Sequence, residues 1–166
     1  MKNARTYIIS AAILALVLIT TNVSAAKIIA EFEGLRLKAY KDSGGLWTIG
    51  YGTTVNPVTG IPIKKGDTIT KDTALTWLRM QTAATESQVK AKLKVPQSAN
   101  QLAALTSLAY NIGLGAFGRS TLLRLVNSNA DKQKIAAEFV KWNRVKGQEV
   151  PGLTRRRQLE AELYLS

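Results

Sequence analysis

The sequence predicts an α+β fold, with a small β-hairpin sheet near one end, a mainly helical lobe after it and a ligand cleft between the two. Two observations lead to this prediction. Residues 46–52 read as a strand next to a glycine-rich turn, and the segments beyond residue 70 repeat apolar residues at helical spacing. The chain has 166 residues, enough for one buried core but too few for two ordinary domains. We therefore expect an N-terminal segment, residues 1–26, followed by one folded domain, residues 27–166.

The first expected element is an apolar helix that directs export. Lys2 and Arg5 precede the apolar run 8–19, and no charged residue lies between Arg5 and Lys27. The positive flank of such a segment stays in the cytoplasm. The rest of the chain is therefore expected beyond the inner membrane, in the periplasm.

The sequence allows two fates for this segment. Cleavage is favoured by the small residues 23–26, which fit a signal-peptidase site after Ala25 or Ala26. Retention is favoured by the uncharged stretch 6–26, which at about 1.5 Å per residue just spans about 30 Å of hydrocarbon. A cleaved signal would free the domain on export, whereas a retained segment would anchor it transiently in the inner membrane.

Residues 27–36 form the next expected element, a short helix with Gly34 near its end and Glu33 in its last turn. Residues 42–45 are typical of a turn, and residues 46–52 of a strand in a small hairpin sheet. The other expected elements are helices separated by Gly, Asn and Pro: residues 70–93, with Thr70 as N-cap, 97–112, 120–127, 131–145 and 154–165.

Charge and residue usage narrow the chemistry. Lys and Arg outnumber Asp and Glu by 23 to 11, and the net charge of +12 favours a polyanionic partner: nucleic acid, an anionic membrane or an acidic wall polymer. No pattern of a nucleic-acid-binding fold is present, so we expect no such partner. The chain has no Cys and no His, which excludes thiol nucleophiles, Ser–His catalysis, disulfides and imidazole-bound metal. Carboxylates are left as the catalysts.

Glu33, Asp42 and Thr48 are the candidate catalytic residues. Glu33 lies where a helix ends, and the negative end of the helix dipole favours its protonated form, which suits a general acid. Asp42 begins a glycine-rich turn whose backbone donors keep a carboxylate ionised, so that it can stabilise a cationic sugar or orient a water. The Thr48 hydroxyl can hold this water. Two carboxylates in unlike environments are what cleavage of a glycosidic bond requires.

Each of these features also has an ordinary structural explanation. Glu33 could be a solvated residue at a helix end, and Asp42 the first residue of a common Asx turn. On the strand, Thr48 shares a face with Leu46 and Gly50. We expect this face to be open, because a glycine there would let a sugar approach the backbone.

Other motifs favour structure over chemistry. Residues 113–118 spell the dinucleotide-binding pattern GxGxxG, but they follow an expected helix rather than a strand, so we expect a loop between helices. Residues 155–157 are three arginines, which favours a solvated helix face; the alternative is that one of them reaches the cleft and pairs with a carboxylate. Trp77 and Trp142 are expected in the core, and Tyr51 stacks on a sugar only if its strand face lines the cleft.

The motifs together resemble those of the phage-type lysozymes, the muramidase endolysins of glycoside hydrolase family 24. Glu33, Asp42 and Thr48 match the E-x8-D-x5-T pattern of that family in type and spacing. The similarity extends over nearly all of residues 27–166, through EGLRLK at 33–38, WTIGYG at 47–52, YNIG at 110–113 and GLTRRR at 152–157.

The resemblance implies a lysozyme-like fold and hydrolysis of the β-1,4 bond between N-acetylmuramic acid and N-acetylglucosamine in peptidoglycan, without metal or cofactor. Glu33 would be the acid, Asp42 would support the attacking water or the cationic state, and Thr48 would help to hold that water in a net inverting reaction. Relatives commonly carry His at the position of Thr53. Members with an export segment resemble signal-anchor-release endolysins, whose segment escapes from the membrane.

Two other functions compete with this hypothesis, and we expect a monomer in each case. A non-enzymatic basic protein that binds the wall or disrupts membranes is favoured by the charge of +12 and the apolar N-terminus. A lytic transglycosylase also works from a glutamate, but Asp42 and Thr48 at this spacing favour hydrolysis.

Overall fold

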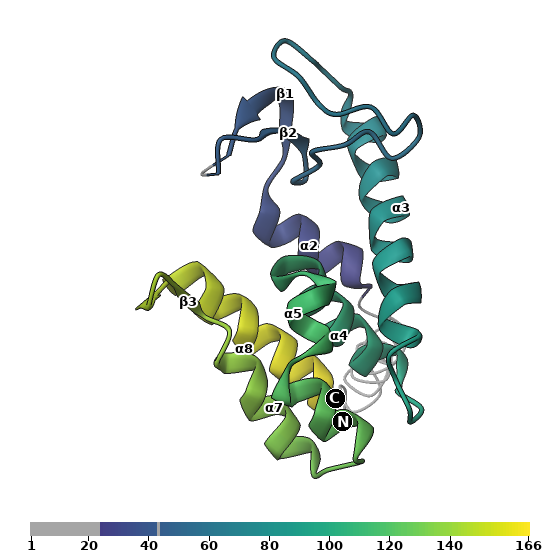
Figure 1. Cartoon of the computed structure of the whole chain (residues 1–166), viewed down its shortest axis with the longest axis vertical. Helices are drawn as coiled ribbons and strands as arrows, with labels where there is room; N and C mark the ends of the chain where they lie inside the picture. Colours follow the sequence, from purple (N-terminus) through teal and green to yellow (C-terminus); the bar gives the residue numbers. More distant parts are fainter. Residues whose placement is uncertain (1–23, 43) are drawn as a thin grey trace, which may run out of the picture.

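The computed structural model describes residues 24–42 and 44–166, so most of the expected export segment lies outside the described residues. The small sheet lies at one end, a group of helices lies at the other and α2 (Ala25–Glu33) lies between them, while the long helix α3 (Lys71–Lys90) runs from the sheet end toward the helical group (Figure 1). The expected α+β class, with a hairpin sheet and a mainly helical lobe, is confirmed. None of the described helices combines the length and the apolar character that crossing a bilayer requires.

Helix α2 places Glu33 at the boundary between the small sheet and the group of helices. The side chain of Ser24 caps the helix by accepting a hydrogen bond from the Lys27 amide at 3.3 Å. Ile28 and Ile29 are buried in the core and fix the helix in place. Gly34 ends it with φ at 68°, a conformation that other residues adopt only with strain. The prediction that Glu33 lies in the last turn is confirmed.

The sheet consists of β1 (Arg36–Lys41) and β2 (Trp47–Gly50), an antiparallel pair in which Tyr40 lies opposite Thr48. The expectation of a helix as far as residue 36 was wrong at its end. The spacing of Leu35 continues the helical pattern, but the positive φ of Gly34 turns the chain out of the helix and into β1. The expected turn then joins two strands instead of a helix and a strand.

The helical lobe is built around α4 (Ala99–Ile112), which packs against α2 and α3 and against α5 (Leu114–Gly118) and α8 (Pro151–Leu165). The lobe is completed by α6 (Thr121–Asn127) and α7 (Lys132–Val140), and α8 also packs on α7 (Figure 1). Helix α7 ends before the expected residue 145, because β3 (Arg144–Val145) pairs with β4 (Gln148–Glu149).

The motifs interpreted as structural lie as expected, with one adjustment. Residues 113–118 follow α4 directly, so the strand that a dinucleotide-binding loop requires is not there, and most of the expected loop is the short helix α5. Trp77 is 8% exposed, and Trp142 packs partly buried against the main core. Both tryptophans therefore belong to the core and are not sugar platforms.

Candidate active site

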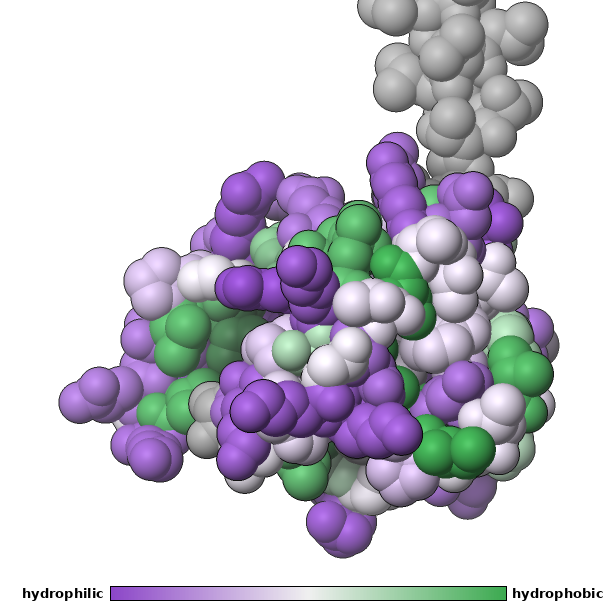
Figure 2. Space-filling view, turned by 90° about the horizontal axis from the view of Figure 1, so that it is seen from above, coloured by the Kyte–Doolittle hydropathy of each residue, from purple (hydrophilic) through white to green (hydrophobic). Residues whose placement is uncertain are grey.

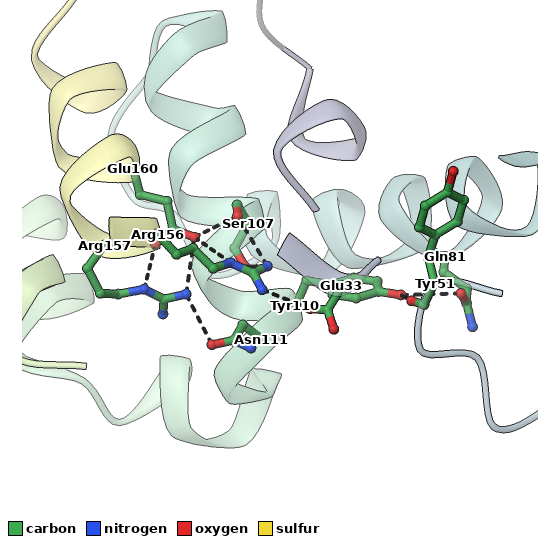
Figure 3. A network of polar contacts seen from close by, with 9 residues as sticks. All are labelled: Glu33, Tyr51, Gln81, Ser107, Tyr110, Asn111, Arg156, Arg157 and Glu160. Carbon is green, nitrogen blue, oxygen red and sulfur yellow. Dashed lines mark hydrogen bonds and ion pairs between the residues drawn. The ribbon is translucent and has the colours of Figure 1, made fainter. Parts of the chain in front are cut away.

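Glu33 lies between the helical lobe and the hairpin side of the molecule. Its Oε1 accepts a hydrogen bond from Nη1 of Arg156 in α8 at 2.8 Å (Figure 3). Its Oε2 faces Gly52, where an added Cβ would lie 3.6 Å from that oxygen. The side chain keeps 25% of its exposure, so one carboxylate oxygen is held by protein while the carboxyl group remains within reach of a ligand.

The three consecutive arginines divide between the two interpretations of their motif. Arg155 is exposed and pairs with Glu31, as on an ordinary solvated helix face. Arg156 is 2% exposed and pairs with Glu33, which is the alternative of an arginine that reaches a site carboxylate. Arg157 is fully buried and contacts Glu160. The preferred expectation of a solvated face was therefore wrong for two of the three, because α8 turns them into the lobe toward buried carboxylates.

The arginine occupies one of the two carboxylate oxygens of Glu33. The buried guanidinium of Arg156 donates its hydrogen bond to Oε1. A guanidinium can only donate hydrogen bonds, so a proton on Glu33 belongs on Oε2, the oxygen that faces Gly52.

Asp42 is held entirely by its own turn. Its Oδ1 accepts hydrogen bonds from the amides of Gly44 and Leu46, each at 2.9 Å. The backbone closes the same turn, since the Asp42 amide donates to the carbonyl of Leu46 at 2.9 Å. The two backbone donors expected from the glycine-rich turn are therefore present and both bind Oδ1.

The structure brings Thr48 to Asp42. Oγ1 of Thr48 lies 3.5 Å from Oδ2 of Asp42 and 3.2 Å from the carbonyl of Leu46, and the residue is 3% exposed. The expected open strand face was wrong. A Cβ at Gly50 would lie 3.3 Å from Cδ1 of Ile69, so this glycine allows close packing beneath α3 instead of an approach by a sugar.

Tyr110 is a residue beside Glu33 that the sequence did not single out. Its hydroxyl lies 3.3 Å from the carbonyl of Tyr51 and 3.4 Å from Oε1 of Gln81 (Figure 3). Burial raises the pKa of Tyr110 to about 12, with a further rise from the charge of Glu33. Only its place in the YNIG motif marked this residue, because its partners come from distant parts of the chain.

Two other residues of the hairpin side lie near Tyr110. Tyr51 is 7% exposed and belongs to the main core, so it is not available to stack on a sugar. Thr53 donates a hydrogen bond to Oε1 of Gln81 at 3.0 Å. Thr53 thus makes a neutral contact with α3.

The Phage lysozyme family model matches residues 30–160. The chain belongs to the phage lysozyme family. The endolysin of Acyrthosiphon pisum secondary endosymbiont phage 1 is 42% identical over 143 residues, covering 84% of this chain and 93% of that relative. The SAR-endolysin of Enterobacteria phage P21 is 35% identical, covering 80% of this chain and 77% of that relative. Among solved structures, the endolysin from Escherichia coli O157:H7 phage FAHEc1 aligns with a TM-score of 0.76 at 39% identity, covering 86% of this chain and 90% of that one.

These similarities confirm the family, the lysozyme-like fold and the activity expected from the motifs. The chain is a lysozyme-type glycosidase, an endolysin that hydrolyses bacterial peptidoglycan and causes host-cell lysis. The non-enzymatic function considered from charge alone is therefore set aside. Which atoms carry the reaction is a separate question, and it depends on the geometry around Glu33 and Asp42.

Proposed function

We propose that this endolysin cleaves the β-1,4 bond between N-acetylmuramic acid and N-acetylglucosamine, with Glu33, Asp42 and Thr48 as its catalytic residues. The observation that carries the proposal is the unlike setting of the two carboxylates. Glu33 has one oxygen on a buried guanidinium and the other facing Gly52, whereas Asp42 is held by backbone amides beside the Thr48 hydroxyl. Such a difference separates an acid from a permanently charged group.

In this proposal Glu33 donates its proton from Oε2 to the leaving oxygen. Sugar rings that cover Glu33 exclude water from the proton transfer. The guanidinium keeps Oε1 occupied, so that the proton is presented on the side of Gly52. The role of Arg156 is thus to orient the acid and to stabilise the carboxylate that forms when the proton leaves.

In this proposal, Asp42 and Thr48 act together on the attacking water. Oδ1 of Asp42 is fully used by the turn amides, which leaves Oδ2 for the reaction. A water that donates to Oδ2 and accepts from the Thr48 hydroxyl is polarised for attack on the anomeric carbon. The negative charge of Asp42 also stabilises the oxocarbenium-like transition state. Attack by this water gives net inversion.

The test is product analysis with the purified full chain on peptidoglycan. Wild type is expected to release new reducing ends of muramic acid, and Glu33→Gln to lose at least about a hundredfold in rate, the lower range for a positioned acid. Glu31→Gln is the matched control, because Glu31 lies on the same helix but is exposed and pairs with Arg155. Anhydro-muramic acid ends would instead show a transglycosylase, and a folded Glu33→Gln protein with wild-type turnover would remove Glu33 from the mechanism.

For localisation, we propose that the export segment is retained as a releasable anchor and that the enzyme escapes from the inner membrane into the periplasm. Support comes from the start of α2. Ser24 caps this helix and Ala25 is 3% exposed in the core, so cleavage after Ala25 or Ala26 would remove the cap and a core residue from the helix that carries Glu33. The name of the similar phage P21 protein, a SAR-endolysin, agrees with this proposal.

The intact mass of the protein from each cell fraction tests this proposal. A full-length mass that moves from the membrane to the periplasm when the membrane is depolarised is the expected result. A mass that begins at Ala26 or Lys27 would show a cleaved signal and an enzyme active from export onward.

A further inference from the structure

A buried group of charges lies behind Glu33, on the side away from Gly52. It consists of Arg156, Arg157 and Glu160 of α8, which are 2%, 0% and 0% exposed, and Ser107 of α4, which is also buried (Figure 3). Isolated charges are costly to bury, so side chains of this kind stay inside a protein only when they satisfy one another. Of the group, only Arg156 contacts Glu33.

Glu160 is the centre of this group. Its Oε1 accepts hydrogen bonds from Oγ of Ser107 at 2.6 Å, from Nε of Arg156 at 3.2 Å and from Nη2 of Arg157 at 3.3 Å. Its Oε2 lies 3.0 Å from Nε of Arg157, an ion-pair contact without hydrogen-bond alignment. The guanidiniums can only donate hydrogen bonds, so they require acceptor oxygens on Glu160 and match its ionised form.

Each nitrogen of the Arg156 guanidinium has its own partner. Nε is bound by Glu160, Nη2 lies 3.3 Å from the carbonyl of Ser107, and Nη1 reaches Glu33 at 2.8 Å. A planar guanidinium that is fixed at two nitrogens has its third direction determined as well. The contact with Glu33 is therefore set from inside the lobe.

The charges of the group balance only together with Glu33. Arg156 and Arg157 supply two positive charges, and Glu33 and Glu160 supply two negative ones. Burial raises the pKa of Glu160, while the guanidiniums of Arg157 and Arg156 and the Ser107 hydroxyl oppose that rise. Burial also lowers the pKa of Arg157 to about 10, which leaves it charged at neutral pH. Without the charge of Glu160, the positive charge behind Glu33 would rise from one to two.

We propose that Glu160 is a positioning residue for the reaction: it holds Arg156 so that Nη1 stays on Oε1 of Glu33. This inference rests on the proposed role of Glu33 as the acid. Another group beside Glu33 is Tyr110 of α4, whose pKa is raised in part by the charge of Glu33. Through Tyr110, α3 contributes the uncharged Gln81.

The proposal is tested by Glu160→Asp, which keeps the charge but shortens the reach to Arg156. The kcat on soluble peptidoglycan fragments is expected to fall about tenfold or more with little change in KM. Arg155→Gln, the exposed neighbour, is the control and is expected to keep the kcat of wild type. A normal kcat in a folded Glu160→Asp protein would overturn the positioning role.

A readout without turnover keeps the test decisive if a variant is inactive. In the full chain labelled with 13C at glutamate carboxyls, the resonance missing from Glu33→Gln identifies Glu33. Its chemical shift is expected to change in Glu160→Asp, because the contact of Arg156 with Glu33 is altered, and to stay in place in Arg155→Gln. Activity of Glu33→Gln separates the two proposals. If that variant is active, the proposed function fails; if it is inactive and the chemical shift does not change in Glu160→Asp, only the role of Glu160 fails.

Discussion

The two carboxylates of the site are held by different parts of the molecule. Asp42 is bound by amides two and four residues further along the chain, within one turn. Glu33 is bound by a guanidinium 123 residues away, which is itself held by a second buried carboxylate. The geometry of Asp42 is therefore a local property of the sequence, whereas that of Glu33 exists only when the helical lobe is assembled.

The charged groups around the two carboxylates also differ in their exposure to water. Asp42 and its turn face solvent in part, with Leu46 61% exposed beside it. Arg156 and Glu160 are almost fully enclosed. An interaction in a dry interior is stronger, and the loss of one partner there costs more. Perturbation of the Glu33 side should therefore affect folding, whereas perturbation of the Asp42 side should affect turnover alone.

Arg156→Met is the change with the largest expected effect on stability. It leaves Glu160 with one cationic partner and Glu33 with none, and loss of one member of a buried ion pair costs about 3–5 kcal/mol of unfolding free energy. Urea unfolding measures the difference. Arg155→Met is the matched control, because its pair with Glu31 is exposed and is worth at most about 1 kcal/mol. Equal losses of unfolding free energy in the two variants would contradict the distinction between a buried and an exposed ion pair.

Asp42→Asn should have a small effect on stability and a large effect on turnover. An asparagine Oδ1 still accepts from the amides of Gly44 and Leu46, so the unfolding free energy is expected to fall by about 1 kcal/mol or less. The negative charge is lost, and the rate on peptidoglycan should drop about a hundredfold. A variant with normal turnover would remove Asp42 from the mechanism, and one that fails to fold would show that the turn needs the charge.

The contrast between local and long-range contacts also explains which features could be predicted from the sequence. The turn at Asp42 and a helix with Glu33 in its last turn depend on residues nearby in the chain, and both were predicted, although the helix was expected to continue to residue 36. Arg156 appeared only as one of three equivalent arginines, because nothing local distinguishes the residue that α8 turns toward Glu33. Strand β1 was missed for a related reason: its residues form a strand through pairing with β2, a contact that periodicity before Gly34 does not indicate.

Tyr110, beside Glu33, makes the stability of the protein depend on pH in the alkaline range. Its pKa is about 12 in the folded protein and about 10 in an unfolded chain. The unfolded chain thus loses this proton first, and the contribution of Tyr110 to stability, complete below pH 10, is lost as pH rises from 10 to 12. Unfolding free energies across this range should fall by about 2 kcal/mol more in wild type than in Tyr110→Phe. Because Glu33 is one cause of the raised pKa, Glu33→Gln should reduce the difference.

Ser24→Ala asks whether α2 itself or its contact with α8 positions Glu33. Loss of the cap hydrogen bond to the Lys27 amide should cost about 1 kcal/mol of unfolding free energy. If Arg156 holds Glu33 from the far side, the weakened start of α2 leaves the position of the acid unchanged, and kcat stays within about twofold of wild type. A loss of kcat in proportion to the loss of stability would show that the helix positions Glu33, and that α8 provides the charge without fixing the geometry.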